Sequence, residues 1–179
     1  MLEKLQSQHL DLILGWRNEP SVRRCMFSNE EITAAQHTAW FRSLAEAEEK
    51  LALLFYFDSY ACGVVQYSNI HAQSRRSSWG FYLSQTAPAL ATLALEVEAL
   101  DYAFDVLGLH SLNCEVIEFN KKVINLHLKC GFTEDGKFRD YHFDGNKFHN
   151  VVRLSMLEGT WAEGQHVVKE RLRALRARR

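Results

Sequence analysis

Residues 79–132 read WGFYLSQTAPALATLALEVEALDYAFDVLGLHSLNCEVIEFNKKVINLHLKCGF, and this stretch decides the fold. Its start, residues 79–83, is mostly apolar and predicts a buried strand, and Pro88 follows in the polar break after it. Apolar residues then recur at steps of four and three, which predicts a core-facing helix. They are Leu93, Val97, Leu100, Phe104 and Leu107. Gly108 is placed to end that helix.

A second strand and a second helix complete the stretch. Residues 112–117 predict a strand, and residues 118–120 lead into a helix that ends at Lys129, with Gly131 beyond its last turn. Two strands joined by a helix of this length imply a right-handed crossover within one sheet. The loop at residues 84–89 therefore opens at the head of a helix, where backbone N–H groups and the helix dipole favour an anion.

The rest of the chain predicts the other elements of one α+β domain with a mixed, mostly antiparallel sheet. Pro20 is expected to break the first helix, and Asp144–Gly145 is a strong hairpin signal between two long strands. The other expected elements are a strand at 2–5, helices at 10–17 and 32–47, a hairpin of strands 51–56 and 62–67 around Asp58–Ser59, and a polar connection at 71–78.

Asn120, His127 and Gly131–Phe132 follow one another at spacings that resemble the Asn…Tyr…Gly-Phe segment of the GNAT N-acetyltransferases. The strand, loop and helix before them resemble the half of that family's fold that binds acetyl-CoA. The resemblance implies a GNAT fold, with helices flanking a sheet that is splayed between its middle strands. It also implies that acetyl-CoA is the co-substrate.

The resemblance spans roughly residues 1–157 and is strongest to one branch, the UDP-4-amino-sugar N-acetyltransferases of pseudaminic acid biosynthesis, which supplies a sugar for flagellin glycosylation. The segments that carry it are Leu14–Asn18, Val22–Arg23, Met26, His37–Phe41, Trp79–Tyr82 and Leu100–Phe104. This likeness implies acetyl transfer to the 4-amino group of a UDP-linked 4-amino-4,6-dideoxy sugar. Two alternatives stay open, an acetyltransferase of ribosomal-protein N-termini or other N-terminal amines, and a GNAT-like binding module without catalysis.

One departure from the family concerns the pyrophosphate loop, where Leu90 and Thr92 replace the glycines of a Gly-x-Gly motif. Backbone donors survive such a change, but tolerance for positive φ and for very close approach of the backbone to a ligand is lost. If the backbone here is the plain start of a helix, both residues fit without strain. We expect the cofactor to contact this loop, the strand before it and the later Asn. The residues are Phe81, Leu83, Ala89, Leu90, Ala91, Thr92, Leu93 and Asn120.

The catalytic roles follow from the resemblance. Glu118 is expected to be the base that takes the amine proton, directly or through water. His127 stands where the family places the tyrosine that protonates the CoA thiolate, and Tyr82 or a water is the alternative donor. Each residue also has a simpler reading. Glu118 then is a solvated carboxylate near a helix start, and His127 is a partly buried histidine within a helix. Asn120 is expected to bind CoA amides and to cap a helix.

The acceptor site is also implied by the resemblance. Arg17, Arg23 and His37 are expected to meet a nucleotide diphosphate, for which Arg offers bidentate geometry. Apolar residues are expected to form a wall against a deoxy-sugar and a uracil, although core packing is an equal reading for two of them, Trp40 and Phe41. The wall consists of Met26, Phe27, Trp40, Phe41 and Tyr82.

Composition bounds the remaining possibilities. The chain has 179 residues, of which 47% are hydrophobic and 24% are charged, as in one soluble domain. The longest apolar run, residues 51–57, suits a buried strand, and no secretory signal opens the chain. The four Cys and eight His show no metal-ligand spacing, so no metal is expected. These features predict a cytoplasmic protein with reduced thiols and without a membrane, and leave a homodimer open. The small nucleotide-sugar substrate is implied by the resemblance alone.

The C-terminus is basic. Residues 167–179 hold six of the 21 Lys and Arg but only one of the 22 acidic residues, so the rest of the chain carries a net charge of −6. No aromatic residue interleaves the basic ones, which argues against nucleic acid as a partner. The sequence therefore predicts an acetyltransferase domain at residues 1–157 and a basic helix at 158–179 packed on it.

Overall fold

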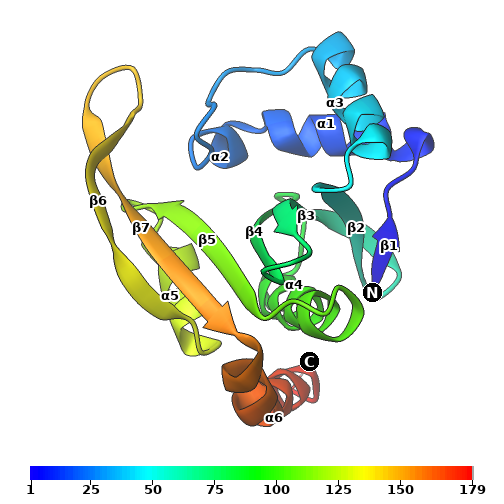
Figure 1. Ribbon diagram of the computed structural model, residues 1–179. Coiled ribbons are helices and arrows are strands. Elements are labelled where there is room, and N and C mark those ends of the chain that lie inside the picture. Colours follow the sequence, from blue (N-terminus) through cyan, green and yellow to red (C-terminus); the bar gives the residue numbers. More distant parts are fainter. Residues whose placement is uncertain (179) are drawn as a thin grey trace.

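The computed structural model describes residues 1–178, which form a seven-stranded sheet with helices on both faces (Figure 1). The strands are β1 (Leu2–Lys4), β2 (Leu51–Phe57), β3 (Tyr60–His71), β4 (Arg76–Leu83), β5 (Ser111–Ile117), β6 (Thr133–Phe143) and β7 (Phe148–Leu157). The α-helices are α1 (Leu10–Asn18), α2 (Pro20–Arg23), α3 (Ala34–Glu46), α4 (Ala89–Asp101), α5 (Lys121–Lys129) and α6 (Glu158–Arg176). A 3₁₀ turn, η1 (Ser7–His9), precedes α1, and a π-helical turn, η2 (Tyr102–Val106), extends α4.

The strand order is β1-β2-β3-β4-β5-β7-β6, and every neighbouring pair is antiparallel except β4 and β5. The predicted mixed, mostly antiparallel sheet is therefore confirmed. The parallel pair arises because α4 carries the chain across one face of the sheet between its two strands, which is the crossover expected from residues 79–132.

The parallel pair is short, and the sheet splays at this point. Only residues 76–78 of β4 pair with residues 111–113 of β5. Beyond them the strands diverge, as Figure 1 shows for the two green ribbons. Residues 79–83 and 114–117 therefore keep one backbone edge without a partner strand.

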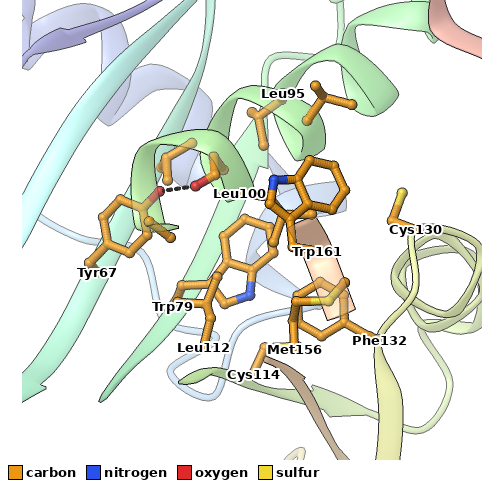
Figure 2. Close-up of a cluster of buried hydrophobic side chains, with 14 of the residues drawn as sticks. Tyr67, Trp79, Leu95, Leu100, Leu112, Cys114, Cys130, Phe132, Met156 and Trp161 are labelled. Carbon is orange, nitrogen blue, oxygen red and sulfur yellow. Dashed lines mark hydrogen bonds between the residues drawn. The ribbon is translucent and has the colours of Figure 1, made fainter. Parts of the chain in front are cut away.

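Two hydrophobic cores lie on opposite faces of the sheet. The larger one fills the space between the sheet and α4, α5 and α6. Figure 2 shows its centre, where Trp79 packs with Leu112, Phe132, Met156 and Trp161. The smaller core packs α1, α2 and α3 over β2, β3 and β4. Its buried members include Ile13, Trp16, Val22, Leu54, Val64 and Tyr82. The alternation of strand side chains thus divides β2 and β3 between the two cores.

The central helix begins and ends where its sequence predicts. Pro88 is the N-cap of α4, and Gly108, at φ +60°, ends the π-helical turn that follows. Of the predicted stripe, Val97, Leu100 and Phe104 are buried, while the two outer members are partly buried. The helix also buries further faces, because it lies between the sheet and α6.

The turns and one connection differ in detail from the expectations. Asp58 and Ser59 both have positive φ in the predicted β2–β3 hairpin, and Gly145 does so between β6 and β7. Pro20 does not simply break the first helix but starts α2 at its first position, where the missing N–H costs nothing. The polar connection shrinks to residues 72–75, because β3 and β4 extend through the polar residues on either side.

The C-terminal helix packs on the domain. Trp161 and Val168 of α6 are buried in the larger core. The indole N–H of Trp161 donates to Asp101 at the end of α4, and the Lys169 ammonium lies 2.8 Å from the same carboxylate. Arg179, the last residue of the predicted basic segment, lies outside the described residues.

Candidate active site

A cavity of about 540 Å³ opens where β4 and β5 separate. Residues 79–83 line it from β4, and Cys114, Glu115 and Val116 line it from β5. These are the residues beyond the paired part of the two strands, so the cavity exposes unpaired backbone N–H and C=O groups. Such an edge binds an extended chain through main-chain hydrogen bonds. We call this space the cofactor cavity.

Four of the predicted cofactor residues line this cavity, namely Phe81, Leu83, Thr92 and Asn120. Asn120 is the N-cap of α5, as the sequence predicts, but its side chain makes no capping hydrogen bond. Its backbone carbonyl accepts from Ile124 instead. The side-chain amide therefore stays available to a ligand.

The other four predicted cofactor residues, Ala89, Leu90, Ala91 and Leu93, form the first turns of α4. The first N–H groups of a helix have no acceptor within the helix. Pro88, the N-cap, has no side-chain oxygen to accept from them, and no side-chain capping bond forms there. The head of α4 thus presents open donors and the positive end of the helix dipole, which suit a phosphate.

The missing Gly-x-Gly motif causes no backbone strain. Leu90 and Thr92 lie inside the regular helix α4. Within residues 1–178, the non-glycine residues with positive φ all lie elsewhere. The family's glycines are therefore not needed for backbone conformation at this position, so backbone strain does not support a binding module without catalysis.

His127 lies on α5 with its ring inside the protein, and it lines the cofactor cavity. Its Nδ1 is 2.7 Å from Oε1 of Glu96, a carboxylate on α4 with no exposed surface. Burial by itself lowers the pKa of His127, but the charge of Glu96 and hydrogen bonds to Glu96 and Cys114 outweigh it and raise the pKa to about 10. The pair with Glu96 therefore favours the imidazolium form of His127, which is the form that can donate a proton.

Glu118 lies outside the cofactor cavity, in a separate hollow lined also by Phe119 and His149. Oε1 accepts from Lys137 at 2.8 Å, and Oε2 accepts from the amide of Asn150 at 2.7 Å. These two hydrogen bonds lower the pKa of Glu118 to about 2. Both oxygens are thus occupied and the carboxylate is a weak base, so the geometry does not favour the role that the resemblance gave it.

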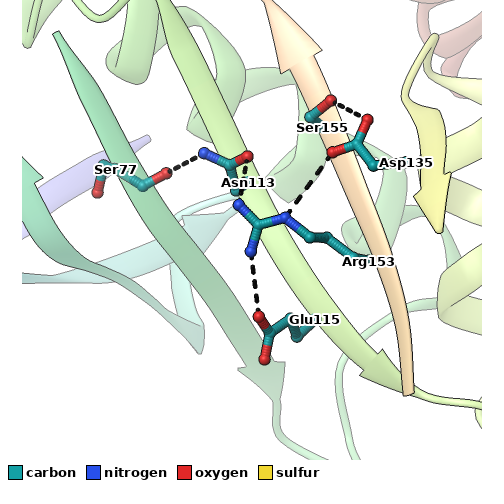
Figure 3. A network of polar contacts seen from close by, with 6 residues as sticks. All are labelled: Ser77, Asn113, Glu115, Asp135, Arg153 and Ser155. Atoms are coloured by element: carbon teal, nitrogen blue, oxygen red, sulfur yellow. Dashed lines mark hydrogen bonds and ion pairs between the residues drawn. The ribbon is translucent and has the colours of Figure 1, made fainter. Parts of the chain in front are cut away.

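Glu115 is the carboxylate that β5 presents to the cofactor cavity. Figure 3 shows how it is held. Nη1 of Arg153 donates to Oε1 of Glu115 at 3.1 Å, and Nη2 donates to Oδ1 of Asn113 at 3.0 Å. Asp135 lies 3.9 Å from Nε of the same guanidinium. Within the described residues, Oε2 of Glu115 has no protein partner and can accept a proton.

Sequence reasoning missed Glu115 although a signal for it exists. Cys114 and Val116, its neighbours, belong to the larger core, so alternation along the strand places Glu115 on the opposite face. This is the face on which Tyr82 belongs to the smaller core, beside α1. The one carboxylate of β5 is therefore a candidate base that strand alternation alone places on this face.

A second cavity of about 320 Å³ adjoins the first and shares Arg17, Gln66 and Tyr82 with it. His37 and Trp40 of α3 line its other side, with their rings stacked 5.0 Å apart. Burial raises the pKa of Tyr82 well above its usual value, and the charge of Arg17 only partly opposes this. The Tyr82 hydroxyl therefore stays protonated between the two cavities. We call this second space the acceptor cavity.

Arg17 dominates the electrostatics of the acceptor cavity. Its guanidinium is buried, and Nη2 donates to the backbone and side chain of Ser28. Nη1 is buried as well and has no hydrogen-bond partner in the described structure. Burial lowers the pKa of Arg17, and burial together with the charge of Arg17 lowers the pKa of His37. The site thus combines one buried cation with a neutral imidazole.

The structure brings only part of the predicted acceptor set together. Met26 and Phe27 line the cofactor cavity, on the side where it meets α2. Arg23 lines neither cavity and pairs with Glu31 at 3.3 Å. Phe41 also lines neither and packs on the smaller core, so for this residue the core-packing reading holds.

The described residues offer no other obvious centre. Among residues 1–178, no group of three or more His, Cys, Asp or Glu gathers in a way that could hold a metal ion. Within the same range, no helix is long and apolar enough to cross a membrane. The four cysteines are all free thiols.

Comparison with known proteins agrees with this geometry. Residues 1–133 match the family described as the acetyltransferase (GNAT) domain. Acetyltransferase PseH of Campylobacter jejuni is 26% identical over 139 residues, which cover 78% of this chain and 86% of that protein. Spermidine N(1)-acetyltransferase of Vibrio cholerae is 33% identical over only 63 residues, 35% of this chain and 36% of that protein.

Solved structures show the same fold. The spermidine N-acetyltransferase of Vibrio cholerae, crystallised with CoA and spermine, superposes with a TM-score of 0.84 at 19% identity and covers 90% of this chain and 97% of its own. The family match extends over well more than half of the chain and includes β4, the head of α4 and β5. The chain belongs to the GNAT family and is an acetyl-CoA-dependent N-acetyltransferase.

Proposed function

We propose that this enzyme transfers an acetyl group to the 4-amino group of a UDP-linked 4-amino-4,6-dideoxy sugar. The observation that carries the proposal is the buried Nη1 of Arg17, which has no partner in a cavity next to the cofactor cavity. An unpaired buried charge is costly, and the oxygens of a diphosphate would satisfy it with charge-assisted hydrogen bonds. The similarity to acetyltransferase PseH supports the same class of acceptor.

The walls of the two cavities suit the remainder of such an acceptor. Trp40 offers a flat ring for a uracil, while Met26 and Phe27 offer apolar surface to a sugar that has lost a hydroxyl. A 6-deoxy sugar presents a methyl group where most sugars present a hydroxyl. The apolar lining is thus consistent with a deoxy-sugar bound between the acceptor and cofactor cavities.

A polyamine is the main rival acceptor, because related folds include spermidine acetyltransferases. Polyamines carry several positive charges and need carboxylates around them. The described residues that line the acceptor cavity include Arg17 and no carboxylate. The same cation that favours a diphosphate therefore repels a polyamine.

Glu115 is the proposed base. The acceptor amine is mostly protonated at neutral pH, and Oε2 of Glu115 is placed to receive its proton directly or through a water. The free N–H groups along β4 can polarise the thioester carbonyl. The amine nitrogen then attacks the carbonyl carbon, a C–N bond forms and the C–S bond breaks.

His127 is the proposed acid for the departing thiolate. It is charged, it lines the cofactor cavity, and it lies on α5 beside the β5 end of the cleft. The ammonium loses two protons on its way to the amide, one to Glu115 before the attack and one from the attacking nitrogen afterwards. His127 gives one proton to sulfur, so the products are an amide, the free thiol of CoA and one proton that passes to solvent.

The acceptor assay tests this proposal. The purified protein is incubated with acetyl-CoA and one of three amines, and the released thiol and the product mass are measured. The amines are a UDP-linked 4-amino-4,6-dideoxy sugar, spermidine and a peptide with a ribosomal-protein N-terminus. We expect the highest kcat/KM for the nucleotide sugar and a large loss for the same sugar without its diphosphate. A preference for spermidine or for the peptide would overturn the proposal.

A further inference from the structure

Glu96 is a charged residue in an unusual place. It lies in the middle of α4 with no exposed surface, and its neighbours Leu95, Val97 and Leu100 belong to the larger core. Oε1 is 2.7 Å from Nδ1 of His127, while Oε2 is buried without a hydrogen-bond partner. A carboxylate in such surroundings costs free energy unless it is paired, so packing alone does not explain its presence.

The pair fixes which nitrogen of His127 faces Glu96. Because Nδ1–H donates to Oε1, the other ring nitrogen, Nε2, is turned away from α4. Aromatic rings hold the imidazole in that orientation, with ring centroids of Phe132 and Trp79 at 4.9 and 5.4 Å. His127 and Cys114 both line the cofactor cavity, and because Nδ1 is taken by Glu96, the hydrogen bond with Cys114 uses Nε2. A thiolate bound in the cavity would replace the Cys114 thiol as the acceptor from Nε2.

The other titratable groups around the pair do not compete for the charge of Glu96. Burial, then the charge of Glu96, raises the pKa of Cys130, and burial followed by the charges of Tyr102 and Glu96 raises the pKa of Tyr67. Both groups therefore stay neutral at working pH. Cys114 contributes a hydrogen bond that favours the charged ring of His127. Arg171 of α6 acts on Cys130 but forms no ion pair with Glu96 within the described residues.

We propose that Glu96 is a positioning residue that keeps His127 oriented and positively charged, so that Nε2 can give its proton to the CoA thiolate throughout the neutral pH range. The inference rests on the proposed role of His127 and adds what makes that role independent of pH. A histidine without such a partner, buried among aromatic rings, would be neutral at pH 7, and a neutral imidazole is too weak an acid to protonate a thiolate.

The first test measures the protonation state of the His127 imidazole. Long-range proton–nitrogen NMR spectra of the full chain are recorded from pH 5 to pH 10 for the wild type, for Glu96→Gln and for Glu98→Gln. Glu98 lies on the same helix and pairs with the N-terminus, so its variant is a matched control. We expect His127 to stay doubly protonated through pH 8.5 in the wild type and in the control, and to titrate below pH 6.5 in Glu96→Gln.

The second test measures kcat and KM as a function of pH. With the same three proteins, we expect kcat of Glu96→Gln at pH 8 to fall by roughly 10²-fold, as for loss of a general acid, and to recover in part toward pH 6. The KM for acetyl-CoA should change less than threefold. If Glu96→Gln does not fold, Glu96→Asp replaces it, and partial retention of the high imidazole titration supports the proposal.

The outcomes distinguish failure of the proposed role of Glu96 from failure of the proposed acceptor. A wild-type His127 that titrates near pH 6.5 overturns the role of Glu96 whatever the acceptor proves to be. A charged His127 with unchanged kcat at pH 8 in Glu96→Gln also overturns it, while leaving the acetyl transfer intact. If no nucleotide sugar is acetylated but the NMR titration is as expected, the acceptor proposal fails and the Glu96–His127 pair stands.

Discussion

Arg153 on β7 and Glu115 on β5 are direct register partners in the antiparallel pair, and Nη1 of Arg153 donates to Oε1 of Glu115 at 3.1 Å. The strand ladder itself therefore positions the carboxylate, and the guanidinium fixes the side chain from one side. Glu115 lines the cofactor cavity beside the splay, on the face of the sheet that also carries Tyr82. A base held in this way is pre-organised before the acceptor arrives.

Replacing Glu115 tests its role as the base. Glu115→Gln keeps the shape and most hydrogen bonding of the side chain but removes its basicity, so we expect kcat to fall by ~10²–10⁴-fold at pH 7. Raising the pH should restore part of the rate, because the amine then loses its proton without help. Steady-state kinetics at pH 6–9 measure this, with CoA affinity by calorimetry as the check on binding.

Glu118→Gln is the matched control for that experiment. It lies three residues later, and its oxygens are bound by Lys137 and Asn150. We expect it to retain most of the wild-type kcat. The opposite result, a large loss in Glu118→Gln and little change in Glu115→Gln, would return the base to the residue suggested by the resemblance.

Arg17 should decide the affinity for the acceptor. Arg17→Met keeps an unbranched side chain but removes the buried guanidinium. Loss of charge-assisted hydrogen bonds, each worth about 1.5–3 kcal/mol, should raise the KM for a nucleotide sugar by roughly 10–100-fold. Arg23→Met, which removes a partly buried cation that pairs with Glu31 and lines neither cavity, is the control and should change KM little. Equal effects of both variants would contradict a specific role for the buried cation.

The head of α4 should bind phosphate through backbone donors alone. Ala89→Pro removes one N–H at the first position of a helix, where proline fits, and residue 88 already has a conformation that tolerates a following proline. We expect CoA affinity to drop by about tenfold or more while the melting temperature stays nearly unchanged. Leu90→Ala, which keeps its N–H, should bind CoA like the wild type, and calorimetry compares the three proteins.

The same geometry predicts that restoring the family's glycines does not help. Leu90 and Thr92 are in regular helix, so Leu90→Gly and Thr92→Gly should each destabilise the protein by roughly 0.5–1 kcal/mol. CoA affinity should not improve, because no residue of this turn has positive φ. Tighter CoA binding in the double glycine variant would show that close approach, rather than φ, limits this site.

The C-terminal helix should contribute to stability and not to catalysis. Deleting residues from Val167 onward removes the buried Val168, the partly buried Leu172 and the contact of Lys169 with Asp101. The loss of apolar burial corresponds to roughly 2–3 kcal/mol and to a melting temperature lower by several degrees. Acetylation of a soluble acceptor should persist below that temperature. A deletion that leaves the melting temperature unchanged would contradict this role.

How much the sequence could predict depends on which force decides each feature. The α4 helix follows from the spacing of its apolar residues, and its end follows from Gly108, because local sequence determines both. The hairpin turns follow from Asp58–Ser59 and Asp144–Gly145 for the same reason. The family resemblance added the splay between β4 and β5, which no local pattern encodes.

The site was harder to predict, because it depends on which side chains meet across distant elements. Glu96 and His127 are 31 positions apart, and nothing in the pattern of α4 distinguishes Glu96 from a solvated helix carboxylate. Arg23 and Arg17 look equivalent in sequence, yet Arg23 pairs with Glu31 and lines neither cavity, while Arg17 is buried and lines both. Glu115 was within reach, since strand alternation alone assigns it to the face of the site.

The last prediction concerns stability at alkaline pH. The pKa of His127 is raised from 6.5 to about 10, so between these values the folded protein holds a proton that the unfolded chain has lost. The stabilisation from the Glu96–His127 pair is fully present below pH 6.5 and is lost as pH rises through about 10. One such proton steepens the fall of unfolding free energy by up to about 1.4 kcal/mol per pH unit.

The double variant Glu96→Gln, His127→Phe removes the pair without leaving a lone buried charge. Urea unfolding at pH 6.5, 7.5 and 8.5 should therefore show a smaller decline for the double variant than for the wild type. Glu118 should show the opposite pH dependence. Its pKa is lowered from 4.5 to about 2, so its contribution to stability is lost as pH falls toward 2. Glu118→Gln should accordingly change the acid limb and leave the alkaline slope as it is. Parallel alkaline slopes for the wild type and the double variant would mean that His127 is not charged in the folded protein.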